Sequence, residues 1–438
     1  MKFDEQTIND LNILPNQSNE SSMFSMFNNV KTVGARRKLK AIFETPLDNL
    51  SEINLRQKSL KYLVNNIEKW NIRFGVRLIK SVERYLRLQV IPITTRNYVK
   101  LNFLRLKYKE NYFDQQQGVI NLYNFLKRLE KIVKAHNSDH LPKLLKDIFF
   151  TFTTFLENDS IKPLLKVKNE NEFKTQSIYI FDNFIRNNLI ESTKDILDKF
   201  YDLEVLISLA STIKTNNYNF PTFVNSKNPI FNAEELYHPF LDNPQKYSFS
   251  LSKTNSFLFL TGPNMAGKTT FLKACGLAVF LAHIGLGVPT KHLKLTLYSN
   301  LICGINTEDN LKLGYSYFFS EVKRVKAVAE VITSEKSVFV ILDELFKGTN
   351  VHDAYEASQK VISSIAKWDN CIFLLSSHLI EIVNTPEIKK ILNCMYFDAK
   401  IENDTPIFTY KLKKGVSKLR LGMKILEKEN IIKILEKK

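Results

Sequence analysis

Hydrophobic positions follow two different periods along this chain. From about residue 31 to 215 apolar side chains recur three and four residues apart, as in the stripe that contains Leu60 and Leu63. This period is typical of amphipathic helices that bury one face. From about residue 216 several prolines mark a change of fold, and short apolar runs then alternate with helical segments, which predicts an α/β domain. The first 30 residues lack a period and predict a mobile tail.

Composition is that of a folded protein, with 44% hydrophobic and 24% charged residues. The four cysteines lie far apart, so neither a zinc site nor a disulfide scaffold is indicated. The first residues are polar and lack the apolar core of a signal peptide, and no apolar run reaches about 18 residues. We therefore expect a cytoplasmic protein that does not enter a membrane.

The net charge of +17 suggests a polyanionic partner such as DNA or RNA. It divides evenly along the chain, with 36 Lys and Arg against 27 Asp and Glu in residues 1–250, and 26 against 18 in residues 251–438. An AT-rich genome is the alternative explanation, because it enriches lysine together with the asparagine and phenylalanine that are abundant here.

The segment TGPNMAGKTT, residues 261–270, has the spacing G-x-x-x-x-G-K-[ST] of a phosphate-binding loop. An apolar run at 256–260 predicts a strand before it, and residues 270–281 predict a helix after it. The glycines allow successive backbone N–H groups to point at phosphate oxygens, and the helix N-terminus favours an anion. Lys268 would contact the β- and γ-phosphates, and the Thr269 hydroxyl would bind Mg²⁺. The expected nucleotide contacts are Gly262, Pro263, Asn264, Met265, Ala266, Gly267, Lys268, Thr269 and Thr270.

Two further apolar runs end in polar residues that suit nucleotide hydrolysis. The predicted strand 338–342 ends in Asp343 and Glu344. An acid at the carboxyl end of a strand beside a phosphate loop is placed to hold Mg²⁺, and the next acid is placed to orient or deprotonate the attacking water. The run 371–375 ends in Ser376, Ser377 and His378, and His378 would sense the γ-phosphate.

The segment Gly314 to Glu321 predicts a loop that opens a helix. Ser316 near the start of this helix is either a simple N-cap or part of a second anion site. Because the chain already has a phosphate loop, such a second site would complete the nucleotide pocket of a neighbouring subunit.

Together these motifs resemble the ATPase of the MutS family of DNA mismatch-repair proteins, within the ABC superclass. The family motifs TGPNMGGKST, GxSTFMVEM, DEIGRGT and ATH correspond in order to residues 261–270, 314–322, 343–349 and 376–378. Fainter similarity over residues 31–230 includes a proline-leucine pair, Pro46 and Leu47, and a lever-like segment at 202–210. The resemblance implies a mobile tail (1–30), an all-α core and lever domain (31–230) and an α/β P-loop ATPase domain with an ABC-like sheet, flanking helices and C-terminal dimerisation helices (231–438).

The resemblance also implies the cofactors ATP and Mg²⁺ and a homodimer with composite ATP sites. Each ATP would lie between Lys268 of one subunit and Ser316 of the other. Thr269 and Asp343 would hold Mg²⁺, and Glu344, His378 and Lys268 would act in hydrolysis. An aromatic residue should stack on the adenine, and both Tyr247 and Phe249 suit this position.

Several positions depart from the family pattern. Lys347 replaces an arginine, Tyr317 replaces a threonine and Asn350 follows the DEIGRGT-like segment, so the steps that couple two subunits are in question. Residues 1–30 are too few for the family's mismatch-reading domain, and residues 70–176 lack the strand pattern of a DNA clamp. We expect an ATPase that binds double-stranded or branched DNA in repair or recombination without reading mismatches. The alternative is an ATPase whose levers act on a protein or a ribosome.

Overall fold

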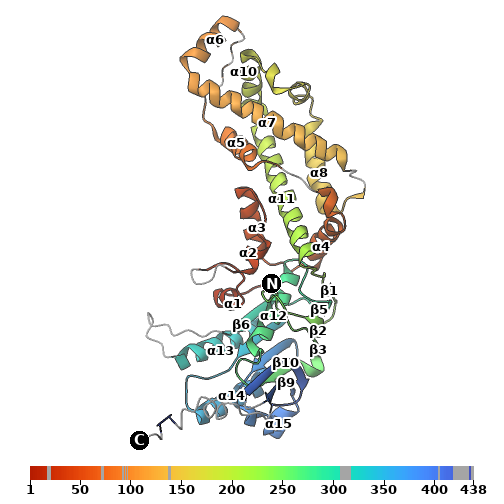
Figure 1. Ribbon diagram of the computed structural model, residues 1–438, viewed down its shortest axis with the longest axis vertical. Coiled ribbons are helices and arrows are strands. Elements are labelled where there is room, and N and C mark those ends of the chain that lie inside the picture. The colour runs from red at the N-terminus through yellow and green to blue at the C-terminus, as the bar shows by residue number, and fades with distance from the viewer. Residues whose placement is uncertain are drawn as a thin grey trace. The chain divides into compact units, whose positions relative to one another are not determined.

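The computed structural model describes residues 1–16, 21–70, 74–90, 93, 95, 97–136, 140–305, 317–402, 405–417 and 434–435. The chain forms two compact units. The sheet unit contains residues 1–26, 43–54 and 215–438, and the helical unit contains residues 27–42 and 55–214. The chain therefore passes between the two units four times. Figure 1 labels the elements of both.

The described elements between residues 33 and 215 are all helices. They are α3 (Val33–Glu44), α4 (Leu50–Asn65), the 3₁₀ turn η1 (Ile67–Trp70), α5 (Val76–Arg87), α6 (Tyr98–Lys107), α7 (Lys109–Ala135), α8 (Lys143–Leu156), α9 (Lys162–Leu165), η3 (Glu170–Glu172), α10 (Thr175–Phe184), the π-helical turn η4 (Ile185–Leu189) and α11 (Ile190–Thr215). None of the described helices is long and apolar enough to cross a membrane.

A buried carboxylate joins three helices of the helical unit. Asp182 on α10 is fully buried, and it accepts hydrogen bonds from Tyr85 Oη on α5 at 2.8 Å and from Gln115 Nε2 on α7 at 2.7 Å. Arg186, one turn later, pairs with the same carboxylate at 2.9 Å. Because the hydrogen-bond partners of Asp182 lie on different helices, the network can form in only one packing arrangement of α5, α7 and α10.

The sheet unit contains two sheets and the helices around them. Its elements are α1 (Glu5–Asp10), α2 (Met23–Phe27), β1 (Thr222–Phe223), β2 (Ile230–Leu236), β3 (Tyr247–Ser252), η5 (Lys253–Asn255), β4 (Phe257–Thr261), α12 (Lys268–His283), β5 (His292–Leu295), β6 (Asn300–Gly304), α13 (Tyr317–Ser334), β7 (Val338–Asp343), α14 (Val351–Ile365), β8 (Cys371–Ser376), η7 (Ile380–Asn384), α15 (Pro386–Lys389), β9 (Leu392–Glu402) and β10 (Thr405–Lys414).

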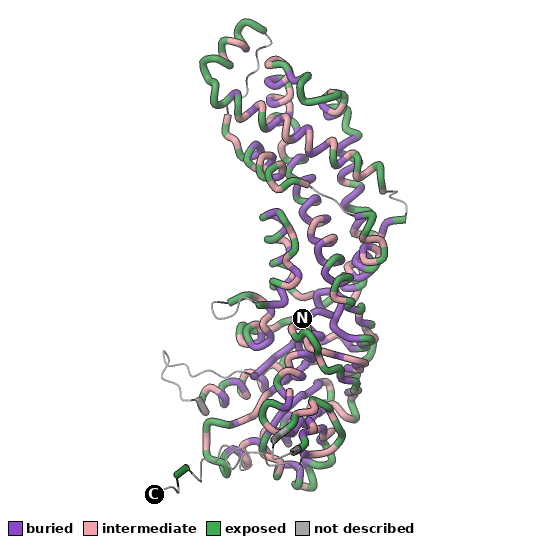
Figure 2. The backbone as a smooth tube through the Cα atoms, in the orientation of Figure 1, coloured by how far each residue is buried: buried purple, intermediate pink, exposed green. Residues whose placement is uncertain are grey.

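The larger sheet has the strand order β10-β9-β4-β8-β7-β6, and all of its pairs are parallel except β9 with β10. The smaller sheet has the order β1-β5-β2-β3. Strands β4 and β8 are buried at every position, as expected for parallel strands covered on both faces. Helix α12 is buried over most of its length (Figure 2). The strands and the helix predicted at 256–260, 338–342, 371–375 and 270–281 are confirmed.

The described residues 1–16 differ from the predicted mobile tail. Strand β6 lies at the edge of the larger sheet, and its outward N–H groups need partners. The N-terminal segment supplies them: Lys2 O accepts from Leu301 N at 3.0 Å, and Thr7 Oγ1 accepts from Cys303 N at 3.0 Å. Asp10 Oδ2 accepts from Ile305 N at 2.9 Å. The sequence did not reveal this role, because capping an edge strand needs no periodic pattern.

The structure also draws the domain boundaries differently from residues 30/31 and 230/231. The helical unit ends at Lys214, so residues 215–230 belong to the sheet unit. Residues 43–54, which include the proline-leucine pair, also belong to the sheet unit, because Phe43 packs on Phe280 with ring centroids 5.8 Å apart and Leu47 N donates to His283 O at 2.9 Å. These contacts are between segments far apart in sequence, which a linear pattern cannot reveal.

The pair of Asp4 with Arg324 generates a stability prediction. Arg324 on α13 is buried, whereas the Asp4 side chain is 44% exposed. Burial raises the pKa of Asp4, but the hydrogen bond and charge of Arg324 outweigh it and hold this pKa below its ordinary value. We expect Asp4→Asn to lower the free energy of unfolding by about 1 kcal/mol at pH 7, a charged hydrogen bond discounted for partial exposure. Urea unfolding measures this difference.

Asparagine is also a good N-cap, so Asp4→Asn should keep the bond from Thr7 N to residue 4 and test the ion pair itself. Because the folded pKa of Asp4 is depressed, the difference from the wild type should disappear as the pH falls through that pKa. Asp159→Asn, which removes a carboxylate that is 94% exposed, is the matched control and should change little. If Asp4→Asn and Asp159→Asn lowered the free energy of unfolding equally, a stabilising ion pair between Asp4 and Arg324 would be refuted.

Candidate functional site

The phosphate loop joins β4 to α12 with a backbone that requires glycine at both ends. Gly262 has φ of 138° and Gly267 has φ of 102°, values that L side chains rarely adopt. A Cβ at Gly262 would also come within 3.1 Å of Phe397 O. Lys268 at the start of α12 is 5% exposed, and its Nζ donates to Gly262 O at 3.0 Å and to Pro263 O at 3.2 Å. Burial lowers the pKa of Lys268, although the nearby Glu344 opposes this shift.

Asp343 connects the ends of three strands. It is the last residue of β7, and Thr269 Oγ1, which follows the loop from β4, donates to its Oδ2 at 2.5 Å. Ser376 at the end of β8 donates its hydroxyl to the other carboxylate oxygen. Ser376 was not singled out from the sequence as a functional residue. Its role comes from the register in which Asp343 lies opposite Ser376.

Glu344 lies between three cationic or titratable groups. His378 Nε2 is 2.6 Å from Glu344 Oε1, Lys347 Nζ is 2.5 Å from Oε2, and Lys268 Nζ is 3.9 Å from Oε1. Burial alone would raise the pKa of Glu344, but the hydrogen bonds and charges of His378 and Lys347 outweigh it and lower this pKa to about 2. Glu344 is therefore a charged hydrogen-bond acceptor at neutral pH.

The loop that begins at Glu344 has an unfavourable backbone conformation, which contacts from helix α13 stabilise. Glu344 has φ of 58° and Phe346 has φ of 59°, in the left-handed region that costs a non-glycine residue on the order of 1 kcal/mol. Glu321 on α13 accepts from Lys347 N at 3.0 Å and Gly348 N at 3.2 Å. The buried Phe346 ring lies 5.8 Å from that of Phe318. Helix α13 thus holds the loop that carries Glu344.

A cavity of about 580 Å³ opens beside the phosphate loop. Its lining includes Lys268, Thr269 and Glu344 together with two aromatic residues, Tyr247 and Tyr410. Tyr410 has φ of 55° at an irregularity in the pairing of β9 with β10, and it lies near Gly267. The sequence analysis missed Tyr410, because a bulge in a strand leaves no mark in the alternating pattern of Phe408 to Leu412.

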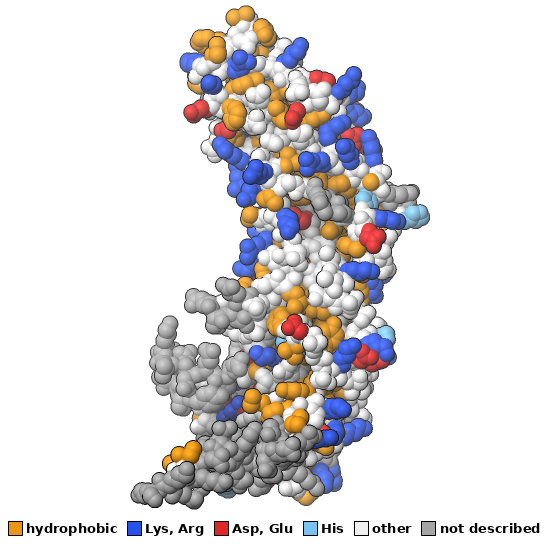
Figure 3. All heavy atoms as spheres, in the orientation of Figure 1, with side chains coloured by type: hydrophobic (Ala, Val, Ile, Leu, Met, Phe, Trp, Pro, Cys, Tyr) orange, Lys and Arg blue, Asp and Glu red, His pale blue; other side chains and the backbone are white. Residues whose placement is uncertain are grey.

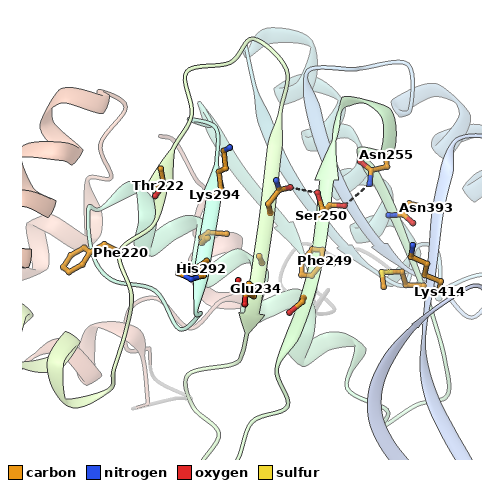
Figure 4. A pocket seen from close by; sticks show the side chains of 15 residues that line it. Phe220, Thr222, Glu234, Phe249, Ser250, Asn255, His292, Lys294, Asn393 and Lys414 are labelled. Carbon is orange, nitrogen blue, oxygen red and sulfur yellow. Dashed lines mark hydrogen bonds between the residues drawn. The ribbon is translucent and has the colours of Figure 1, made fainter.

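The structure separates the two residues that suit adenine stacking. Tyr247 lines the cavity of the phosphate loop. Phe249 instead lines a different pocket of about 800 Å³ over the smaller sheet, where Ser250, Asn232 and Asn255 form a chain of hydrogen bonds (Figure 4). Of the two aromatic residues, only Tyr247 borders the cavity beside the phosphate loop.

The remaining residues named from the sequence lie in or after the phosphate loop, at the starts of α13 and α14, or outside the described residues. Pro263, Asn264, Met265, Ala266 and Thr270 lie in or directly after the phosphate loop, where Met265 is 80% exposed and Ala266 is fully buried. Ser316 lies outside the described residues. Asn350 caps α14 by accepting from Asp353 N at 2.9 Å, and Tyr317 is the first residue of α13.

The donor set fits a magnesium nucleotide. Thr269 and Asp343 offer a hydroxyl and a carboxylate oxygen, the hard oxygen ligands that Mg²⁺ prefers. Gly262 and Gly267 allow the loop backbone to curve around an anion, and Lys268, which donates to two loop carbonyl oxygens, could donate to phosphate oxygens instead. The fold and these residues define an α/β ATP-binding domain of the phosphate-loop class.

Comparison with known proteins gives the family. Residues 258–437 match the family model of MutS domain V. A DNA mismatch repair protein MutS of Petrotoga mobilis is 23% identical over 515 aligned positions, which cover 97% of this chain and 62% of that protein. A DNA mismatch repair protein MSH3 of Candida glabrata is 26% identical over 258 positions, covering 56% of this chain and 25% of that protein. Residues 258–437 therefore form a domain of the MutS domain V family, and the chain is similar to DNA mismatch repair proteins, spanning less than two thirds of the length of either relative.

Proposed function

We propose that this chain is a Mg²⁺-dependent ATPase that binds DNA and acts in DNA repair or recombination. The observation that supports hydrolysis is the convergence of Lys268, Thr269, Asp343, Glu344 and His378 at the carboxyl ends of β4, β7 and β8. Ligands of open α/β sheets bind at this edge of the strands. MutS-family members are ATPases, so family and geometry support the same chemistry.

Each residue has a separate role in this proposal. When bound, Mg²⁺ neutralises charge on the phosphates and shields them from repelling the attacking water. Thr269 and Asp343 hold the ion, with Ser376 fixing the carboxylate. Lys268 and the loop N–H groups stabilise the phosphate oxygens. Tyr247 and Tyr410 border the place of the base.

Glu344 orients the attacking water by accepting its hydrogen bond. With a pKa of about 2 it is a weak base, so positioning contributes more than full proton removal. His378, whose side chain is 43% exposed, links this carboxylate to the solvent side of the site and responds to a phosphate placed there. Lys347 pairs with the other carboxylate oxygen of Glu344. Part of this contact must be lost when the water binds to that oxygen.

DNA is the partner that charge favours. The helical unit holds 33 Lys and Arg against 17 Asp and Glu, a net charge of +16, whereas the sheet unit holds 29 against 28, a net charge of +1. The even division between chain halves hides this contrast, because residues 1–250 combine the whole helical unit, with a net charge of +16, with segments of the sheet unit whose net charge is −7. A genome-wide composition bias would raise the charge of both units, so the contrast favours a polyanion on the helical unit.

The first prediction concerns water activation. Glu344→Gln should keep ATP affinity within about threefold while turnover falls at least about 100-fold, because the amide keeps the side-chain shape but loses the anionic acceptor. Steady-state ATPase rates and nucleotide titration measure the two quantities. Glu381→Gln on η7 is the control and should behave as the wild type. Near-normal turnover of Glu344→Gln would remove Glu344 from the mechanism.

The second prediction concerns a site shared between subunits. If Ser316 serves the nucleotide of the neighbour, mixing Lys268→Ala and Ser316→Arg chains should restore activity, because the mixed dimer has one intact pocket and one doubly damaged pocket. Each variant alone has two damaged pockets. ATPase rates before and after mixing measure the recovery. Absence of recovery in demonstrated heterodimers would contradict the shared site.

The third prediction concerns DNA. Affinity for a duplex should fall at least about tenfold between about 50 and 200 mM salt, because binding releases counterions from the phosphates. Matched and single-mismatch duplexes should bind within about threefold of each other, since phosphate contacts carry no sequence information. Fluorescence anisotropy across a salt series tests both. A roughly tenfold mismatch preference would contradict the prediction, and no DNA binding at low salt would favour a protein partner.

A further inference from the structure

Helix α6 of the helical unit presents apolar side chains to solvent. Val99, Phe103 and Leu106 are 76%, 61% and 72% exposed, and their spacing of four and three residues places them on one face. Tyr98 at the start of the helix is 65% exposed. Leu101, which is 1% exposed, lies on the opposite side and holds α6 against the unit. Figure 2 shows α6 exposed along most of its length. A contiguous apolar face in water is typical of a surface that binds a partner.

Cations surround this face. Lys100 and Lys107 lie on α6 and Lys109 lies next to it, whereas Arg105 turns toward α10 and α7, where it donates to Thr175 Oγ1 at 3.1 Å. The sequence has no acidic residue from Asn97 to Lys109. Lys107 Nζ lies 5.2 Å from the ring centroid of Tyr108, itself 47% exposed. In Figure 3 hydrophobic and basic side chains lie side by side over α6. The partner therefore combines negative charge with apolar or aromatic surface.

The charges disfavour a second copy of this chain as the partner, because both copies would bring the same cations to the contact. An anionic membrane would use only the cations that border the α6 face. The four basic residues from Asn97 to Lys109 account for a quarter of the net charge of +16 on the helical unit, so most of the excess positive charge lies elsewhere on this unit. A nucleic acid, which extends beyond one helix, would use that wider basic surface.

A regular duplex is not the best occupant of the α6 face either. Its bases stack on one another inside the helix, so Phe103 and its apolar neighbours on the α6 face would stay in water while the lysines bind phosphate. Unpaired bases expose flat faces that stack on aromatic side chains, and such a stack contributes about 1–3 kcal/mol per base. We propose that Phe103, between the exposed Val99 and Leu106, is a stacking platform for an unpaired base, so that single-stranded or branched DNA is the preferred ligand of the helical unit. This inference rests on the proposed DNA-binding function.

The test compares DNA forms with variants of the full chain. Fluorescence anisotropy is measured with a 20-nucleotide oligo-dT, a 20-base-pair duplex and a fork with unpaired arms. We expect Phe103→Ala to lose about tenfold in affinity for oligo-dT and for the fork, and less than about twofold for the duplex. Phe103→Trp should keep wild-type affinity for oligo-dT, because tryptophan also stacks.

Phe150→Ala on α8 is the matched control, since Phe150 is 72% exposed in the same unit and should not affect any of the three affinities. Equal losses for oligo-dT and duplex, or no loss for oligo-dT, would overturn the stacking platform and leave duplex binding intact. A wild-type chain that binds none of the three DNA forms would overturn the DNA-binding function itself. Sedimentation with phosphatidylserine vesicles, reduced by Phe103→Ala while oligo-dT binding is unchanged, would assign the face to a membrane instead.

Discussion

The parallel pairing of β4, β8 and β7 is the constraint on which the candidate site depends. Parallel strands place their carboxyl ends at one edge, so the phosphate loop after β4, the acids after β7 and His378 after β8 meet there. The bonds of Asp343 to Thr269 and Ser376 hold these ends together. Because each contact joins a different strand, a shift of one residue in register would move Asp343 to the other face of the sheet.

At this edge of the sheet an unfavourable backbone conformation places the Glu344 carboxylate in the site. Glu344 and Phe346 both have positive φ, and hydrogen bonds from the loop to Glu321 support that conformation. Helix α13, which provides Glu321, also carries Arg324, which pairs with Asp4 of the N-terminal segment. The N-terminal residues therefore stabilise the sheet edge and the helix that supports the loop of Glu344.

The two units divide the chemistry between them. The sheet unit is nearly neutral and contains the nucleotide site, whereas the helical unit carries almost all of the excess positive charge and the exposed face of α6. An ATPase site needs a few precisely placed charges, while a polyanion is attracted by many loosely placed ones. Under the proposed function, this separation would allow the affinity for DNA to change without altering the nucleotide site. The four chain crossings between the units are the covalent routes through which one could affect the other.

The sequence by itself determined the elements and residues whose chemistry depends on local spacing. The phosphate loop, the strand that ends in Asp343 and Glu344, and the helical period before residue 215 were all predicted, because turns, strands and helices leave short-range patterns. Only the tertiary structure decided that Tyr247 rather than Phe249 borders the cavity, that Tyr410 joins it and that Ser376 holds Asp343. It also decided that residues 1–16 cap an edge strand and that the charge belongs to one unit. These features depend on register, bulges and contacts between segments hundreds of residues apart, and no periodic pattern encodes them.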